Sequence, residues 1–156
     1  MVSGDAQVSG NAKVYGDAKV YGDAKVTGKA KVSGKAHVSG YAFVSDNAKV
    51  TGNAQVSGNA LVSGDARVDG NAQVDGHAWV SGNARVSGDA KVSDNAKVTD
   101  NAKVSGNAKV SGDIQIAGDT KIRNMSDYTA FVEHNNRSNA LSDGLNDLSS
   151  QDDIQL

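Results

Sequence analysis

Six residues, V-S-G-N/D-A-x, recur without insertion or deletion from the first residues of the chain to about residue 123. An aliphatic residue stands at every sixth position from Val2 to Val110, and then at Ile116 and Ile122. Ala follows each Val four places later, except in the last two units, and Gly occupies 17 of the 20 turn positions from 4 to 118. A period this strict predicts a repeat architecture, in which each unit is stable only when stacked on its neighbours.

The repeat divides into a short strand and a turn. In each A-x-V triplet the outer two residues point to one side and x to the other, which is the two-residue period of a strand. The S-G-N/D triplet is a turn, because Gly accepts positive φ without steric cost. Where Gly is absent, Asp replaces it and Asn follows, at Asp46, Asp94 and Asp100. After Gly, Asp and Asn adopt positive φ most readily, so the turn is retained at these three positions.

A strand of three residues buries little alone, so we expect three units to close a triangular coil and coils to stack in register. Val8 and Ala12 show an aliphatic residue followed four places later by a small one. This spacing resembles that of the hexapeptide-repeat left-handed β-helix superfamily. The V-S-G-N/D-A-x repeat sequence is most similar to that of YdcK-like bacterial proteins. The resemblance implies an all-β, single-domain left-handed parallel β-helix, and twenty units at three per coil give about 6–7 coils. Left-handedness follows from the resemblance alone, since left-handed crossovers are otherwise rare.

With 18 residues per coil, the outward residues sort into three columns, and one column gathers large apolar side chains. Phe43, Leu61 and Trp79 should stack on consecutive coils, with Tyr41 and His77 at the adjoining corner and lysines at both ends. An exposed apolar patch with a polar rim is typical of a partner surface. The favoured interpretation is a homo-oligomer, or another protein partner; trimers are common in the resembled family. The alternative is that a C-terminal helix of the same chain covers the patch.

A second column is entirely basic. Its members are Lys13, Lys31, Lys49, Arg67, Arg85, Lys103 and Lys121. Like charges in register repel, so the column needs solvation or anions. We favour solvation, since exposed Lys keeps solenoids soluble and discourages edge pairing. A polyanion is the weaker alternative, and a column without aromatic residues argues against nucleic acid.

The repeat also resembles that of hexapeptide acyltransferases, which use a His base and a protruding loop at a cleft between subunits. This chain has His37, His77 and His134, and no loop interrupts its repeat. The enzyme alternative would therefore be a site formed between subunits, with His77 as base. Three His on zinc, as in the carbonic-anhydrase branch, would need convergence that the sequence does not indicate. We expect a non-catalytic structural or interaction protein, with no catalytic residues, metal or cofactor.

After Ile122 the repeat stops, which divides the chain into a β-helix over residues 1–123 and a helical cap with an acidic tail over 124–156. We expect Ser126 to cap a helix that begins at Asp127 and covers the solenoid end with residues 127–135. A second short helix would carry Leu141, Leu145 and Leu148, and residues 149–156 would be disordered. No apolar run approaches the length of a bilayer span, and the repeat begins at once, which predicts a cytoplasmic protein.

Overall fold

The structure is a computed structural model that describes the backbone of residues 1–149 and the side chains of residues 1–138. Twenty two-residue strands are followed by one helix, α1 (Met125–Ser149). The strands are β1 (Gln7–Val8), β2 (Lys13–Val14), β3 (Lys19–Val20), β4 (Lys25–Val26), β5 (Lys31–Val32), β6 (His37–Val38), β7 (Phe43–Val44), β8 (Lys49–Val50), β9 (Gln55–Val56), β10 (Leu61–Val62), β11 (Arg67–Val68), β12 (Gln73–Val74), β13 (Trp79–Val80), β14 (Arg85–Val86), β15 (Lys91–Val92), β16 (Lys97–Val98), β17 (Lys103–Val104), β18 (Lys109–Val110), β19 (Gln115–Ile116) and β20 (Lys121–Ile122).

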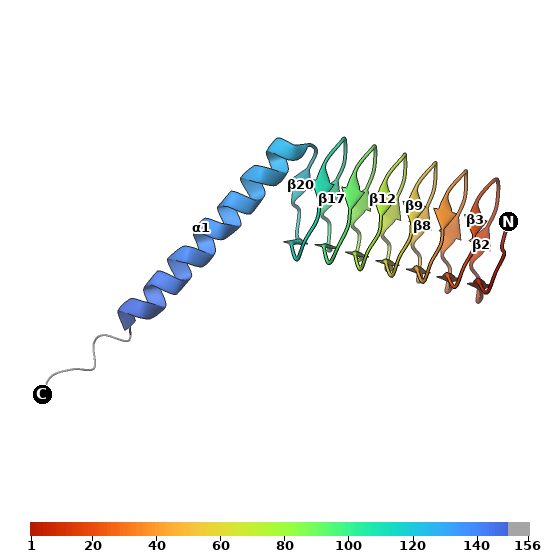
Figure 1. The fold of residues 1–156 in the computed structure, drawn as a ribbon, viewed down its shortest axis with the longest axis horizontal. Helices are drawn as coiled ribbons and strands as arrows, with labels where there is room; N and C mark the ends of the chain where they lie inside the picture. Colours follow the sequence, from red (N-terminus) through yellow and green to blue (C-terminus); the bar gives the residue numbers. More distant parts are fainter. Residues whose placement is uncertain (150–156) are drawn as a thin grey trace, which may run out of the picture.

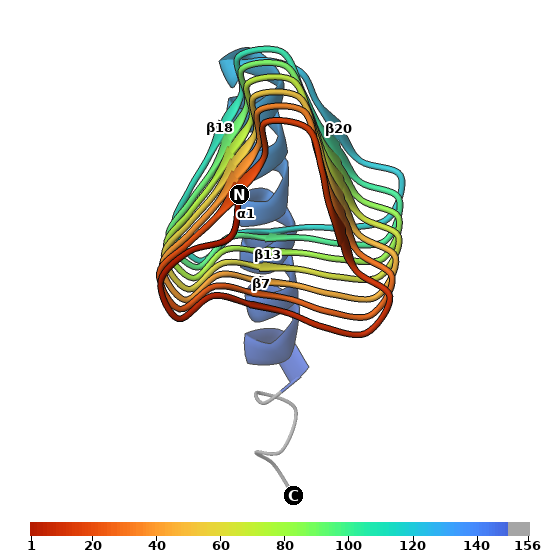
Figure 2. The same ribbon diagram turned by 90° about the vertical axis from the view of Figure 1, so that its right-hand side faces the viewer.

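Every third strand belongs to the same parallel sheet, so the sheets form the three sides of a triangular rod (Figure 2). Sheet A has the order β3-β6-β9-β12-β15-β18, sheet B β1-β4-β7-β10-β13-β16-β19, and sheet C β2-β5-β8-β11-β14-β17-β20. Viewed from the N-terminal end, the chain passes counterclockwise from the side of β13 to that of β20 and then that of β18 as it recedes (Figure 2). The coil is therefore left-handed, which confirms the predicted left-handed parallel β-helix.

The interior is filled by the Val and Ala of the repeat. Every repeat Val from Val20 to Val110 is at most 1% exposed, and Ile116 and Ile122 continue the same row. Burying one such side chain contributes about 1.5–3 kcal/mol before the cost in chain entropy. Val2 and Val8, in the first coil, are 46% and 37% exposed, whereas the same positions in the coils stacked after it are buried. Stacking against a preceding coil is thus what makes the apolar positions a core.

The turns explain why Gly recurs. The repeat glycines have φ near +65 to +70° in most coils, and Asp46, Asp94 and Asp100 take φ of 57–58° in their place. A Cβ placed on Gly58 would lie 2.9 Å from the Gly76 carbonyl oxygen one coil further on, so the turns stack too closely for most side chains. Where Asp replaces Gly, its side chain makes a hydrogen bond that Gly lacks: the Asp46 carboxylate accepts from the Gly64 N–H at 3.0 Å.

The helix starts earlier than predicted and does not divide in two. Asn124, not Ser126, is its cap, because the Asn124 Oδ1 accepts a hydrogen bond from the Asp127 N–H at 2.9 Å. The Asp127 carboxylate in turn accepts from the Arg123 N–H. One helix continues from Met125 to Ser149 because neither Pro nor Gly separates the two predicted stretches. The predicted disorder concerns residues that, apart from Ser149, lie outside the described part of the chain.

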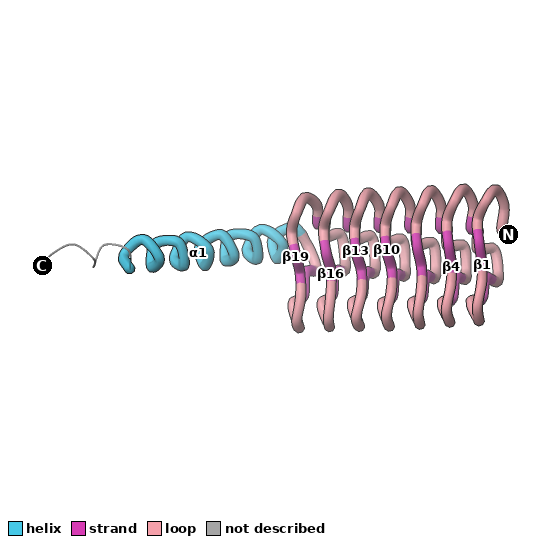
Figure 3. Tube along the Cα trace, turned by 90° about the horizontal axis from the view of Figure 1, so that it is seen from below, coloured by secondary structure: helices cyan, strands magenta, loops and turns pink. Residues whose placement is uncertain are grey.

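The first turns of α1 pack against the C-terminal end of the rod. Tyr128 and Phe131 are partly buried against the core, and the Tyr128 hydroxyl donates to the Ser111 carbonyl oxygen at 3.2 Å. Beyond these turns α1 runs away from the last coil at a slant (Figures 1 and 3). At the opposite end of the rod, Met1 and Val2 are exposed at 70% and 46%.

Candidate interaction surfaces

The first candidate surface is the aromatic patch, which we define as Tyr41, Phe43, Leu61, His77 and Trp79. Leu61 pairs in register with Phe43 on one side and with Trp79 on the other, so the three side chains occupy consecutive strands of sheet B. Phe43 and Leu61 are half-buried, whereas the Trp79 side chain is 42% exposed. A ridge of three large apolar groups therefore lies on an otherwise polar face.

Tyr41 and His77 extend the aromatic patch onto the corner between sheets A and B. They occupy the same turn position two coils apart, and their backbone N–H groups donate to the carbonyl oxygens of Gly58 and Asp94 in the following coils. Tyr41 is the most exposed aromatic residue, at 69%. Both side chains are held on rigid turns and project to solvent, which is how residues at a protein interface are presented.

Lysines bound the aromatic patch along the rod, as the column order predicts. Lys25 pairs with Phe43, and Lys97 pairs with Trp79 on the next strand. The Lys97 Nζ lies 5.8 Å from the centroid of the Trp79 ring, which is a cation–π distance. The patch is thus closed at both ends by cations, and at one end the cation covers part of the apolar surface.

Two aromatic side chains near the patch, Tyr21 and His37, were not predicted to lie together. The rings of Tyr21 and His37 meet edge to face, with centroids 6.3 Å apart. Tyr21 lies at the corner that leads from sheet A to sheet B, and His37 lies on β6 of sheet A, so they continue the aromatic surface around the edge of the rod. The available signal was that Tyr stands in the Ser position of the repeat at Tyr15 and Tyr21.

The second candidate surface is the basic ladder, the seven outward Lys and Arg of sheet C named above. Arg67 pairs in register with Lys49 and with Arg85, and the same pairing continues along the sheet to both ends. Six of the seven are exposed and Lys49 is half-buried. Within the described residues, the ion pair found is Arg123–Asp127, so no carboxylate in that part of the chain forms an ion pair with a ladder residue.

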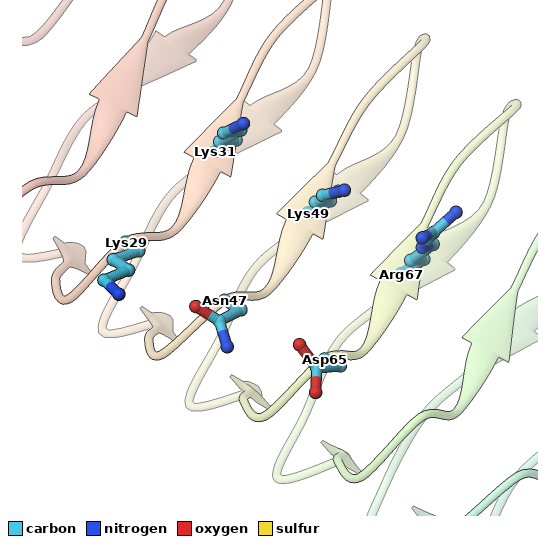
Figure 4. Close-up of a pocket in the computed structure, with 6 residues that line it drawn as sticks. All are labelled: Lys29, Lys31, Asn47, Lys49, Asp65 and Arg67. Atoms are coloured by element: carbon cyan, nitrogen blue, oxygen red, sulfur yellow. The ribbon is translucent and has the colours of Figure 1, made fainter.

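A shallow groove of about 290 Å³ lies beside the middle of the ladder. Figure 4 shows its two rows: Lys31, Lys49 and Arg67 along the strands, and Lys29, Asn47 and Asp65 at the corner. Cations line both rows at one end of the groove, while Asp65 tempers the charge at the other. The groove offers ammonium, guanidinium and amide donors over three coils, which suits carboxylates or other anions.

The three His residues lie on different parts of the fold. His37 lies on sheet A, His77 at a corner and His134 on α1. Across the described residues, no three His, Cys, Asp or Glu side chains group together as metal ligands would. A second pocket lies between α1 and the last coils and is lined by Asp113, Ile114, Gln115, Val132, Asn135 and Asn136. Within the described part of the chain, no helix has the length and hydropathy that a bilayer crossing requires.

A continuous β-solenoid with a filled core, whose sequence varies on its outer faces, is the structure of a scaffold that acts through its surface. Residues 1–109 match the family model described as "Bactofilin: Polymer-forming cytoskeletal". The chain therefore belongs to the bactofilin family, a structural family that assembles by self-association. This confirms the predicted non-catalytic structural solenoid and homo-oligomer, and it does not favour the acyltransferase alternative.

A Bacillus cereus protein provisionally described as an acetyltransferase has a similar structure, with a TM-score of 0.47 and 12% sequence identity over 76% of this chain and 69% of that chain. That likeness is too distant to bear on function. No curated protein matches the chain at a significant level.

Proposed function

We propose that this chain is a subunit of a homopolymeric structural scaffold and that its copies associate sideways through the aromatic patch. The observation that supports the patch as the contact is the register of Phe43, Leu61 and Trp79 on consecutive strands of one flat sheet. Removing such a ridge from water is favourable by roughly 25 cal/mol per Å² of apolar area. In this structure α1 leaves the rod at its C-terminal end, so it does not cover β7, β10 and β13 (Figure 1).

The architecture fits a structural role. The rod is built from the same unit throughout, so a contact on one coil is held at a fixed spacing from a contact on any other. Its surfaces for partners and its core for stability are made by different positions of the repeat, x on one side and Val and Ala on the other. The outward residue of a repeat can therefore be replaced without changing the Val and Ala that form the core.

Four finer features belong to the same proposal. We propose a trimer as the smallest closed assembly, because trimers are common among the hexapeptide-repeat proteins that the chain resembles. We propose a cytoplasmic location and a kinship to YdcK-like repeat proteins, which the wording of the repeat supports. Residues 1–123 would act as the scaffold and residues 124–156 as a separate appendage.

Light scattering on the full chain tests the aromatic patch. We expect the wild type to give a mass several times that of the chain, and Phe43→Ser/Trp79→Ser to give a much smaller one. Gln55→Ser/Gln73→Ser is the matched control, because these residues occupy equivalent outward positions in register on sheet A. Equal masses for the wild type and the patch variant would reject the patch as the contact.

A further inference from the structure

The basic ladder gathers like charges on one side of the rod, and Asp65 at the adjoining corner offsets only part of their repulsion. Seven cations stand in register on sheet C, at about 4.8 Å from strand to strand. Like charges directly opposite each other in a sheet are destabilising. Sheet A shows that the fold does not require them, since its equivalent column includes His37, Gln55 and Gln73. An anionic partner would offset the repulsion.

The chain itself contains a segment of opposite charge. From residue 124 onward there are six acidic residues and one basic residue, while the repeat body has an excess of three positive charges. Most of the acids fall within α1, whose 25 residues extend about 37 Å. The ladder of seven strands extends about 29 Å. The two elements therefore match in charge and nearly in length.

The described part of the segment, which ends at Ser149, does not lie along its own ladder. After its first turns α1 points away from the rod beyond the last coil (Figures 1 and 3). Glu133 is already exposed there, two residues after the last aromatic contact with the core at Phe131. An acidic helix that projects from one end of a rod with a basic side is placed to meet another copy.

We infer that the C-terminal segment of one copy docks along the basic ladder of a neighbouring copy. The groove of Figure 4 lies at the centre of the docking surface, where Lys31, Lys49 and Arg67 meet the carboxylates of the segment. The contact joins two different surfaces, so it is heterologous and can continue from copy to copy as an open chain. This inference rests on the self-association proposed above, and adds a second contact to it.

Charge reversal in the full chain tests the inference. The ladder variant is Lys49→Glu/Arg67→Glu/Arg85→Glu, and the segment variant is Glu133→Lys/Asp143→Lys/Asp147→Lys. The matched control is Lys19→Glu/Lys91→Glu/Lys109→Glu, which changes the net charge equally but on sheet A. Association is measured by sedimentation velocity at low and high salt, and circular dichroism confirms that each variant is folded.

The ladder and segment variants should each associate on the order of tenfold more weakly than the wild type, as expected when several screened ion pairs are lost together. A mixture of the two should recover wild-type association, because each variant then meets a partner of opposite charge. The sheet A variant should associate as the wild type does, because both its ladder and its segment are unchanged. The inference is overturned if the mixture of ladder and segment variants associates no better than either variant alone, or if the sheet A variant is weakened as much as the ladder variant.

The patch variant Phe43→Ser/Trp79→Ser, measured alongside, separates the two claims. Loss of association in the patch variant with wild-type behaviour in both charge variants overturns docking of the segment alone. Loss in the charge variants with wild-type behaviour in the patch variant overturns the patch alone. If the ladder binds anionic lipid vesicles while association ignores both charge reversals, its partner is a membrane surface and the inference fails.

Discussion

The ammonium group of Lys97 lies 5.8 Å from the centroid of the Trp79 ring, one strand further along sheet B. This pair marks the boundary of the aromatic patch: the ring supplies apolar surface and the lysine separates it from the polar coils beyond. Trp79 is also the one Trp of the chain, so its fluorescence reports on this position alone.

Trp79 emission should move to shorter wavelength as protein concentration rises, because association through the patch removes a 42% exposed indole from water. Acrylamide quenching should weaken over the same concentration range. Phe43→Ser, which keeps Trp79 but breaks the ridge, should hold the emission at its dilute-solution value. A constant emission in the wild type while the mass increases would mean that copies associate elsewhere.

Replacing Gly58 by Ala tests how closely the turns stack. The new Cβ would lie 2.9 Å from the Gly76 carbonyl oxygen, while a Cβ at Gly112 meets nothing within 4 Å. Both glycines have positive φ, so backbone strain is common to both substitutions. We expect Gly58→Ala to lower the free energy of unfolding by about 1–3 kcal/mol more than Gly112→Ala, measured by urea denaturation. Equal losses would show that only the backbone conformation demands glycine.

Asp46 should be more than a tolerated substitute for Gly. Asp46→Ala keeps the left-handed backbone and loses the hydrogen bond to the Gly64 N–H, so it should cost about 1–2 kcal/mol in urea denaturation. Asp46→Gly relieves the strain while losing the same bond, and should stay within about 1 kcal/mol of the wild type. If the Ala variant matched the Gly variant, the φ of 58° would carry no cost.

The helix cap provides a test of the corrected start of α1. Asn124→Ala removes the acceptor for the Asp127 N–H and should cost about 1 kcal/mol of helix stability, seen as lower helicity by circular dichroism. Ser126→Ala lies inside the helix and should leave the helicity unchanged or slightly higher. The opposite order would restore Ser126 as the cap.

Most of the fold follows from the sequence because the repeat has no insertions. Pairing i with i+18 is then fixed once three units make a coil, and the partners of Leu61 follow by counting. The 18-residue spacing does not predict contacts between different columns. The Tyr21–His37 contact joins a corner residue to a strand residue, and it depends on the direction of the two side chains. The repeat also gives no information after Ile122, where it ends. Asn124 and Ser126 are both suitable residue types for a helix cap, so the sequence does not decide where the helix begins.

Self-association is the central claim, and the mass of the wild-type chain in solution over a concentration series tests it most directly. We expect masses well above the 15.9 kDa of one chain, increasing with concentration as copies add to the assembly. A single species of 15.9 kDa at every concentration would contradict the account.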